Sequence, residues 1–231
     1  MKILKEPITK MEKEAIYTHL LFVIICLIII LIPLGIGIGL KLFILVVIYN
    51  VLVGIVGFWQ KYELWIDIWL YVLILSIFQL FPDWFLSAEL GILVFPDDGF
   101  IKIGTVSLYM AGLWTIPLFL IIYTGLKINE RYSKLITYIT VGLLSLLIFG
   151  LAEQTMWMLQ SWYAKKVAMI GHLALYIIIP EIILGLTSYY CFKLIREKNH
   201  LMKIPVTFIV MLIYLGSAVL FFFIFERIVF P

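Results

Sequence analysis

The fold is decided by the apolar run IGHLALYIIIPEIILGLTSYYCF, residues 170–192. About 20 apolar residues are enough to cross a bilayer as a helix. Glu181 lies near the centre of the run, directly after Pro180, and a carboxylate at that depth costs about 3 kcal/mol. A proline inside a helix also leaves the carbonyl one turn earlier without its usual donor. The run therefore predicts a membrane-spanning helix with a functional acid inside it.

The composition extends this prediction to the whole chain. The 231 residues are 65% hydrophobic and 13% charged, whereas soluble domains are about 45–50% apolar and about 25% charged. We therefore expect an all-α, polytopic membrane bundle that forms one integral-membrane domain over residues 1–231. The net charge of +3 is too small and too dispersed to favour a nucleic-acid partner. Cys26 and Cys191 fall in apolar runs, so a disulfide framework is not expected.

Seven continuous apolar runs predict seven membrane-spanning helices, because a helix satisfies its own backbone hydrogen bonds in lipid. A tight turn at Pro33 and Gly35 is expected between the first two, although a kinked or re-entrant segment is the alternative. The predicted helices cover residues 17–34, 36–58, 64–82, 104–125, 133–152, 168–192 and 204–225.

The basic residues predict the orientation, because Lys and Arg are enriched in cytoplasmic segments. Seven helices place 12 of the 17 basic residues on one side of the membrane, which puts the amino terminus in the cytoplasm. We expect the protein in the plasma (inner) membrane. The 12 residues are Lys2, Lys5, Lys10, Lys13, Lys61, Lys127, Arg131, Lys134, Lys193, Arg196, Lys198 and Lys203.

An internal helix–loop–helix repeat is predicted over residues 63–125 and 133–192. Each unit has an Ala-Glu dipeptide, an aromatic-rich loop and an apolar run with an Ile-Pro dipeptide. A site between the two copies is expected, as in other repeated membrane folds. The aligned pairs are Glu89 with Glu153, Tyr109 with His172, and Ile116-Pro117 with Ile179-Pro180.

Three acids are the candidate catalytic residues. Glu181 is the expected acid, since a buried carboxyl group without a partner holds its proton at neutral pH, while Glu89 and Glu153 are placed at the mouth of the pocket. The simpler interpretation of Glu181 is a structural partner for Tyr, His or Lys on a neighbouring helix. Residues expected to contact a substrate are Asp98, Tyr109, Trp114, Trp157, Trp162, His172 and Tyr176.

Other interpretations of these residues remain open. The loop aromatics also fit the aromatic belt found at membrane interfaces. The segment Phe95-Pro96-Asp97-Asp98-Gly99 is typical of a turn, and a single Asp pair is weak support for a magnesium–diphosphate site. Three histidines are too few for a membrane di-iron centre, and no metal or other cofactor is expected.

These residues resemble those of small integral-membrane terpenoid enzymes, namely membrane lycopene cyclase domains, related carotenoid hydratases and seven-helix meroterpenoid cyclases. The resemblance covers residues 63–192 and lies in Glu89 with Phe95-Pro96 and Ile116-Pro117, then Glu153 with Trp162 and Ile179-Pro180-Glu181. Cyclase domains usually have two adjacent acids after the proline; this chain has one in the second unit and Leu118 in the first.

The resemblance implies a cofactor-independent enzyme that cyclises or hydrates an isoprenoid-type membrane lipid. Two other hypotheses fit the same acids or the same architecture. One is a proton- or cation-coupled transporter, or a non-enzymatic binding protein, for which a homodimer could form through Gly35 and Gly39. The other is a structural subunit of a larger complex.

Overall fold

A computed structural model of the chain describes residues 8–33 and 35–230. Within those residues, seven helical segments are long and apolar enough to cross a membrane, so the predicted all-α bundle and multi-pass membrane protein are confirmed. Lys2 and Lys5, used above to predict orientation, lie outside the described residues. The segments are Lys10–Leu31, Ile38–Trp59, Glu63–Glu89, Met110–Arg131, Lys134–Leu159, Leu175–Ile195 and His200–Val229.

The first two segments are separate antiparallel helices, α1 (Lys10–Leu31) and α2 (Ile38–Trp59). A capping box between Thr9 and Glu12 begins α1. At its other end, Lys41 of α2 donates to the carbonyls of Ile30 and Ile32, at 3.2 and 2.9 Å. A lysine ammonium at a helix C-terminus is favourable because the last carbonyls have no helical donor. In the described residues on either side of position 34 the chain turns between two separate helices, as the predicted turn requires, rather than continuing as one kinked or re-entrant helix.

The third and fifth spans are longer than predicted. The third comprises α3 (Glu63–Phe78), α4 (Leu80–Trp84) and a π-helical turn η1 (Phe85–Glu89). Pro82 lies in the first turn of α4, where its missing N–H leaves the Phe78 carbonyl of α3 without its usual helical donor and so separates α3 from α4. The fifth comprises α7 (Lys134–Thr155) and the 3₁₀ turn η2 (Met156–Leu159). Asp83 and Glu153, expected in loops, are therefore helical.

The fourth span is interrupted where its two parts, α5 (Met110–Leu113) and α6 (Thr115–Arg131), meet. Asn50 of α2 lies beside this break and donates to Thr115 Oγ1 at 3.1 Å and to the Gly112 carbonyl at 3.4 Å. Trp69 Nε1 in turn donates to Asn50 Oδ1 at 3.2 Å. These bonds satisfy polar groups that the break would otherwise leave bare in the bilayer.

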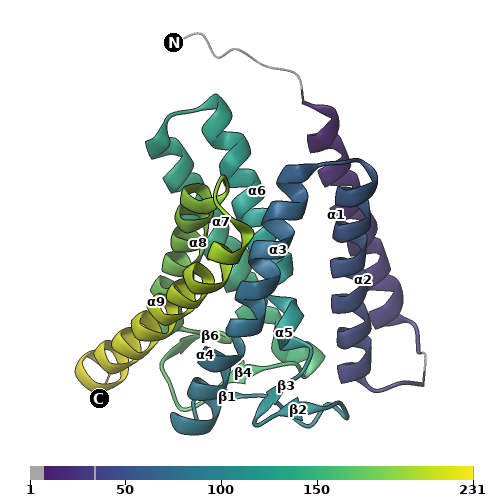
Figure 1. Cartoon of the computed structure of the whole chain (residues 1–231). Coiled ribbons are helices and arrows are strands. Elements are labelled where there is room, and N and C mark those ends of the chain that lie inside the picture. The colour runs from purple at the N-terminus through teal and green to yellow at the C-terminus, as the bar shows by residue number, and fades with distance from the viewer. Residues whose placement is uncertain (1–7, 34, 231) are drawn as a thin grey trace.

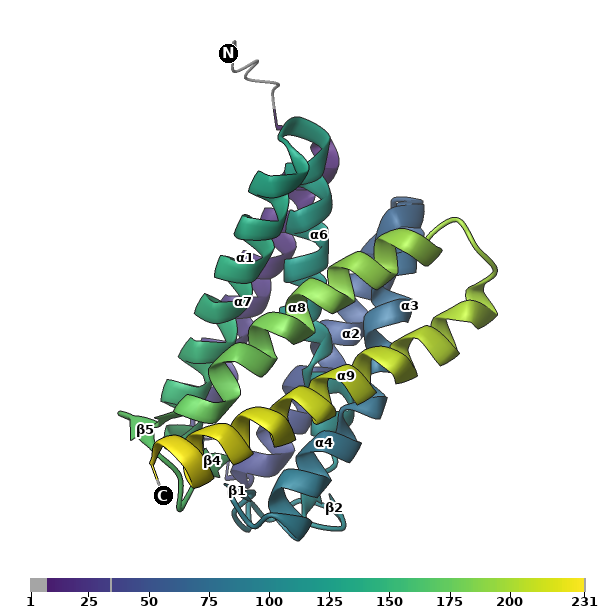
Figure 2. The same cartoon turned by 90° about the vertical axis from the view of Figure 1, so that its left-hand side faces the viewer.

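The last two spans are α8 (Leu175–Ile195), and α9 (Lys203–Phe223) flanked by the 3₁₀ turn η3 (His200–Met202) and the π-helical turn η4 (Ile224–Val229). In Figure 2, α8 and α9 run side by side across the bundle at a slant to α6 and α7. At the end where α9 begins, Lys203 donates to Asp67 Oδ1 of α3 at 2.8 Å and lies 2.7 Å from His200 Nδ1. This hydrogen bond connects the first residue of α9 to α3.

Short strands form in the two long loops, at the lower end of the bundle in Figure 1. The first loop contains β1 (Leu93–Val94) and the hairpin β2 (Lys102–Ile103) and β3 (Val106–Ser107); the second contains β4 (Tyr163–Ala164) and the hairpin β5 (Met169–Ile170) and β6 (Leu173–Ala174). β1 and β4 pair antiparallel and so join the two loops. The connections between α2 and α3, α6 and α7, and α8 and α9 lie toward the opposite end.

The hairpins correct the alignment of the repeat. Gly104 and Gly171 occupy the same turn position, at φ of +60° and +64°, which favours glycine. The strands on either side have the same register, Ile103 opposite Val106 and Ile170 opposite Leu173. With the turns superposed, Tyr109 corresponds to Tyr176 rather than to His172, which belongs to the second hairpin turn and not to a helix.

Candidate functional site

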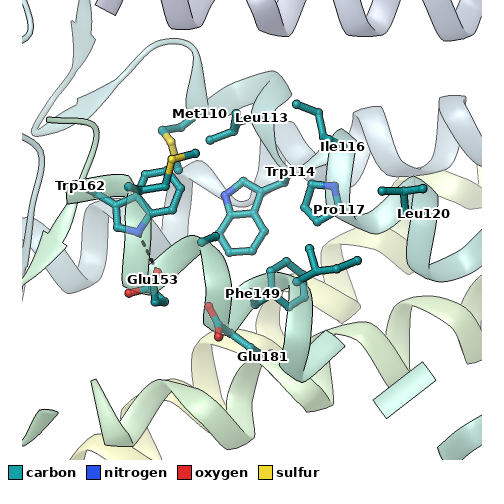
Figure 3. A pocket seen from close by; sticks show the side chains of 13 residues that line it. Met110, Leu113, Trp114, Ile116, Pro117, Leu120, Phe149, Glu153, Trp162 and Glu181 are labelled. Atoms are coloured by element: carbon teal, nitrogen blue, oxygen red, sulfur yellow. Dashed lines mark hydrogen bonds between the residues drawn. The ribbon is translucent and has the colours of Figure 1, made fainter. Parts of the chain in front are cut away.

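A cavity of about 190 Å³ lies among α5, α6, α7 and α8. Its walls are largely apolar, with side chains such as Leu113, Ile116 and Phe149. Figure 3 shows two carboxyl groups, those of Glu153 and Glu181, beside the indoles of Trp114 and Trp162. The cavity therefore combines two acids from the second unit of the predicted repeat with one indole from each unit.

Glu153 reaches the cavity because α7 continues one turn beyond its predicted end. Trp162, in the loop that follows, folds back so that its Nε1 donates to Glu153 Oε1 at 2.7 Å. Trp162 itself is buried. A short bond from an indole N–H fixes one carboxylate oxygen and leaves the other able to interact with a ligand.

Glu181 enters from α8, one residue after Pro180. The residue is only 3% exposed, and no described group donates a hydrogen bond to its carboxyl group. The expected structural partner among Tyr, His or Lys is therefore not found in the described part of the chain. Burial without a donor favours either a protonated carboxyl group or a bound cationic partner.

Asp83 is a third acid that the sequence interpretation did not select. Its carboxyl group accepts from Trp114 Nε1 at 3.2 Å, and it lines a small pocket of about 20 Å³. That pocket adjoins the main cavity, because both are lined by Glu153, Trp114 and Trp162. The available signal was the dipeptide Pro82-Asp83, which has the same proline–acid order as Pro180-Glu181.

The three acids are close enough for their charges to interact. Among the described residues that line the two pockets there is no Lys, Arg or His, and the described residues contain no group of His, Cys, Asp and Glu suited to a metal ion. Like charges in a region of low dielectric repel strongly. The site is therefore arranged to hold protons on some of its carboxyl groups, or to attract a cation.

Two of the predicted aromatic residues, Tyr176 and Tyr109, lie next to the main cavity. Tyr176 lines the smaller pocket. The hydroxyl of Tyr109, a buried residue, lies 2.9 Å from Ser161 Oγ, next to Trp162. Burial raises the pKa of Tyr109 to about 12, so its hydroxyl is protonated at neutral pH and bonds the loop that holds Trp162.

The other predicted residues lie outside the cavity. Glu89 is exposed, because the third span continues to that residue and turns it away from the pocket. Asp98 is buried, but it accepts from Ser107 Oγ at 2.8 Å and from the Phe100 amide at 3.0 Å, as the turn interpretation requires. Trp157 and His172 are exposed and stack on each other, with ring centroids 4.2 Å apart.

Gly39, one of the two glycines expected to form a dimer contact, instead packs against the first loop of the same chain. The Gly39 amide donates to the Asp98 carbonyl at 3.2 Å, and a Cβ at Gly39 would lie 2.6 Å from atoms of Asp98 and Phe100. The small residue is therefore needed where α2 meets the first loop. The Gly35 and Gly39 spacing does not form a free helix face.

Fold and site together define a polytopic membrane protein with an acid-lined cavity between its helices. The chain belongs to the family described as a domain of unknown function, DUF6989, which it matches over residues 80–225. That segment contains Asp83, Glu153 and Glu181 and every residue that lines the cavity. No curated protein and no solved structure matches the chain.

Proposed function

We propose that the protein is a membrane enzyme that acts on an isoprenoid-type lipid by acid-initiated cyclisation or hydration. One observation carries the proposal: a single apolar cavity contains two carboxyl groups and two indoles, with no basic side chain among its described lining residues. Protonation of a carbon–carbon double bond needs an acid in a dry pocket, and a cationic intermediate is stabilised by aromatic faces and a carboxylate.

In this mechanism Glu181 is the acid. Its proton is transferred to one carbon of a double bond, which forms a C–H bond and leaves a positive charge on the neighbouring carbon. A second double bond of the same chain then donates its electron pair to form the ring C–C bond. Loss of a proton to Glu153 gives a cyclic alkene isomeric with the substrate, and a proton passed from Glu153 to Glu181 restores the acid.

In the hydration reaction, water adds to the cation and Glu153 accepts the proton that water loses. The Trp162 donor on Oε1 keeps Glu153 in position for either role. Trp114 presents its ring to the cavity while its N–H is bonded to Asp83. An indole is the aromatic side chain that best stabilises a cation, so both indoles serve the charged intermediate.

The cavity volume limits what it can hold. Pockets for drug-sized ligands measure about 300–1,000 Å³, and this one is about 190 Å³. One end of a linear isoprenoid chain fits such a cavity, and the rest of the chain extends along the bundle. The distribution of Lys and Arg favours a cytoplasmic amino terminus, and we place the protein in the plasma (inner) membrane as part of this proposal.

The test is mass spectrometry of lipids that co-purify with the wild-type protein and with Glu181→Gln. The matched control is Glu89→Gln, which changes an exposed acid on the same side of the bundle. We expect a linear isoprenoid on Glu181→Gln and its cyclic or hydrated product on the wild-type and control proteins. Ordinary phospholipid alone on all three, or unchanged product on a folded Glu181→Gln protein, would refute the proposal.

A second function, proton- or cation-coupled transport, is favoured by Asp83. This acid extends the row of carboxyl groups from the main cavity into the adjoining pocket, and buried acids in series are typical of proton pathways. The test is substrate flux into proteoliposomes with an imposed pH gradient. Flux that stays the same when the gradient is collapsed would exclude proton coupling.

A further inference from the structure

The small pocket that Asp83 lines, beside the acid cavity, has the size of a single water molecule. It measures about 20 Å³. A water molecule needs about 10–15 Å³ of such space, so the pocket has room for one water and for no organic ligand. Leu93 and Phe95, both buried residues of the first loop, form part of its wall. We call it the Asp83 pocket.

The Asp83 pocket is lined by two carboxyl groups and two phenols, those of Asp83, Glu153, Tyr176 and Tyr214. Each carboxyl group accepts from one indole, at Asp83 Oδ2 and at Glu153 Oε1. Their other oxygens and both phenol hydroxyls have no hydrogen-bond partner among the described residues. Asp83, Tyr176 and Tyr214 are each at most 3% exposed. Buried polar groups without partners are uncommon, so these four indicate a polar molecule between them.

The spacing of the four groups fits a bridging water. A hydroxyl within about 3.0 Å of a carboxylate oxygen would bond to it directly, and no such bond joins the four groups in the described part of the chain. Polar groups that face one another across a longer gap are typically bridged by water. A buried water makes about 2–4 hydrogen bonds, whereas a magnesium or calcium ion takes about six or more oxygen ligands. Four groups therefore suit a water rather than such an ion.

The Asp83 pocket also adjoins the place where a cationic intermediate would form. Glu153 lines both the pocket and the acid cavity, while Glu181 lines the cavity only. Because the Trp162 N–H occupies Glu153 Oε1, Oε2 is the oxygen available to a molecule in the pocket. A water held by that oxygen borders the cavity but is kept apart from the acid, Glu181.

We propose that the Asp83 pocket binds one water molecule and that this water is the nucleophile, which makes the protein a hydratase. This inference rests on the proposed function and selects hydration over cyclisation. The water donates to Asp83 Oδ1 and Glu153 Oε2 and accepts from a phenol hydroxyl, so one lone pair remains for bond formation. When Glu181 has protonated the double bond, that lone pair forms the C–O bond and Glu153 accepts the proton that the water loses. Asp83 is a positioning residue in this step.

The water itself is tested by radiolytic hydroxyl-radical labelling in water enriched in heavy oxygen. A bound water split by radiolysis oxidises the side chain beside it, and peptide mass spectrometry identifies the labelled residue. We expect Tyr214 to take up heavy oxygen although it is only 2% exposed. The matched control is Tyr49, which is also buried but whose hydroxyl lies 3.0 Å from His19 Nε2; it should stay unlabelled. A wild-type Tyr214 without label would overturn the water site.

Two variants test the part that Asp83 has in holding the water. Asp83→Leu removes the polar group and fills the pocket, so it should abolish the Tyr214 label. Asp83→Asn keeps a polar side chain of the same size and should retain the label. Each variant is compared with wild type only when it elutes as a single species with Tyr49 still unlabelled. A label that survives in Asp83→Leu, or is lost in Asp83→Asn, would contradict the role of Asp83.

The role of the water in the reaction is read from the product. The lipid that co-purifies with Glu181→Gln is incubated with wild-type protein in the labelled water, and we expect an alcohol heavier by one labelled water. With Asp83→Leu the product should shift toward a cyclic isomer of unchanged mass. A cyclic isomer alone on wild-type protein would overturn the hydratase assignment. Glu181→Gln separates the two proposals, because it should lose turnover and keep the Tyr214 label; turnover that survives there contradicts the catalytic proposal alone.

Discussion

The contact between Lys203 and Asp67 provides a sharp test of the packing of α9 on α3. Lys203 is 1% exposed, and its Nζ lies 2.8 Å from Asp67 Oδ1. The change Lys203→Met keeps a long apolar side chain and removes the charge. We expect this variant to be destabilised, because Asp67 then remains without its cation.

The magnitude follows from the burial of the two partners. Removing one member of a buried ion pair costs about 3–5 kcal/mol. The Asp67 side chain is 23% exposed, so water and His200 compensate part of that loss, and we expect about 2–3 kcal/mol. In Lys203→Met with Asp67→Asn no charge is left unpaired, and the loss should fall to about 1 kcal/mol.

The assay is reversible unfolding in mixed micelles of increasing dodecyl sulfate content, followed by tryptophan fluorescence. Lys198→Met is the matched control, since Lys198 is exposed on the same connection between α8 and α9. A Lys203→Met protein within about 0.5 kcal/mol of wild type, which is the usual range for surface substitutions, would refute the reasoning. Additive effects in the double variant would refute the pairing.

Three further predictions concern the site and its loops. Trp114→Phe should lower the free energy of unfolding by about 1–3 kcal/mol, because Asp83 loses its donor; equal stability in the same micelle assay would contradict that bond. Gly171→Ala should cost about 1–2 kcal/mol, since its φ is +64° and a Cβ would lie 2.7 Å from Gln154 Oε1; proteolysis of the second loop should become faster, and an unchanged rate would argue against the strain. Wild-type stability should fall from pH 10 to pH 12, because Tyr109 has a pKa of about 12 when folded and about 10 when unfolded; the fall should be smaller in Tyr109→Phe, and an equal fall would show that other groups cause it.

The seven spans were predictable because bilayer thickness fixes the length of an apolar run. The residues at which the spans begin and end were harder to predict. A run stops at polar residues such as Asp83 and Glu153, yet the helix continues through them because indole donors from elsewhere in the chain cover their carboxyl groups. Residues 168–174, which look apolar enough for a helix, form a hairpin because Gly171 supplies the turn.

The candidate site was predictable in part. Glu181 was predicted from its depth in an apolar run, Glu153 and Trp162 from the second aromatic loop, and Trp114 from its place in the predicted fourth helix of the repeat. Glu89 was placed by alignment, and alignment does not determine which way a side chain points on the last turn of a helix. Contacts between distant positions, such as Lys203 with Asp67, depend on how helices cross, and no local pattern encodes that.

The pairing of β1 with β4 has a consequence for biosynthesis. Leu93 and its partner Ala164 are 71 residues apart, so at about 5–20 residues per second the first strand waits roughly 4–14 s for the second. During that interval the first loop has an unpaired edge outside the bundle, and Asp83 is already covered by Trp114. We therefore expect the nascent chain to insert its first four spans before the two loops can pair, and the acid cavity to form only when α8 follows the second loop and brings in Glu181.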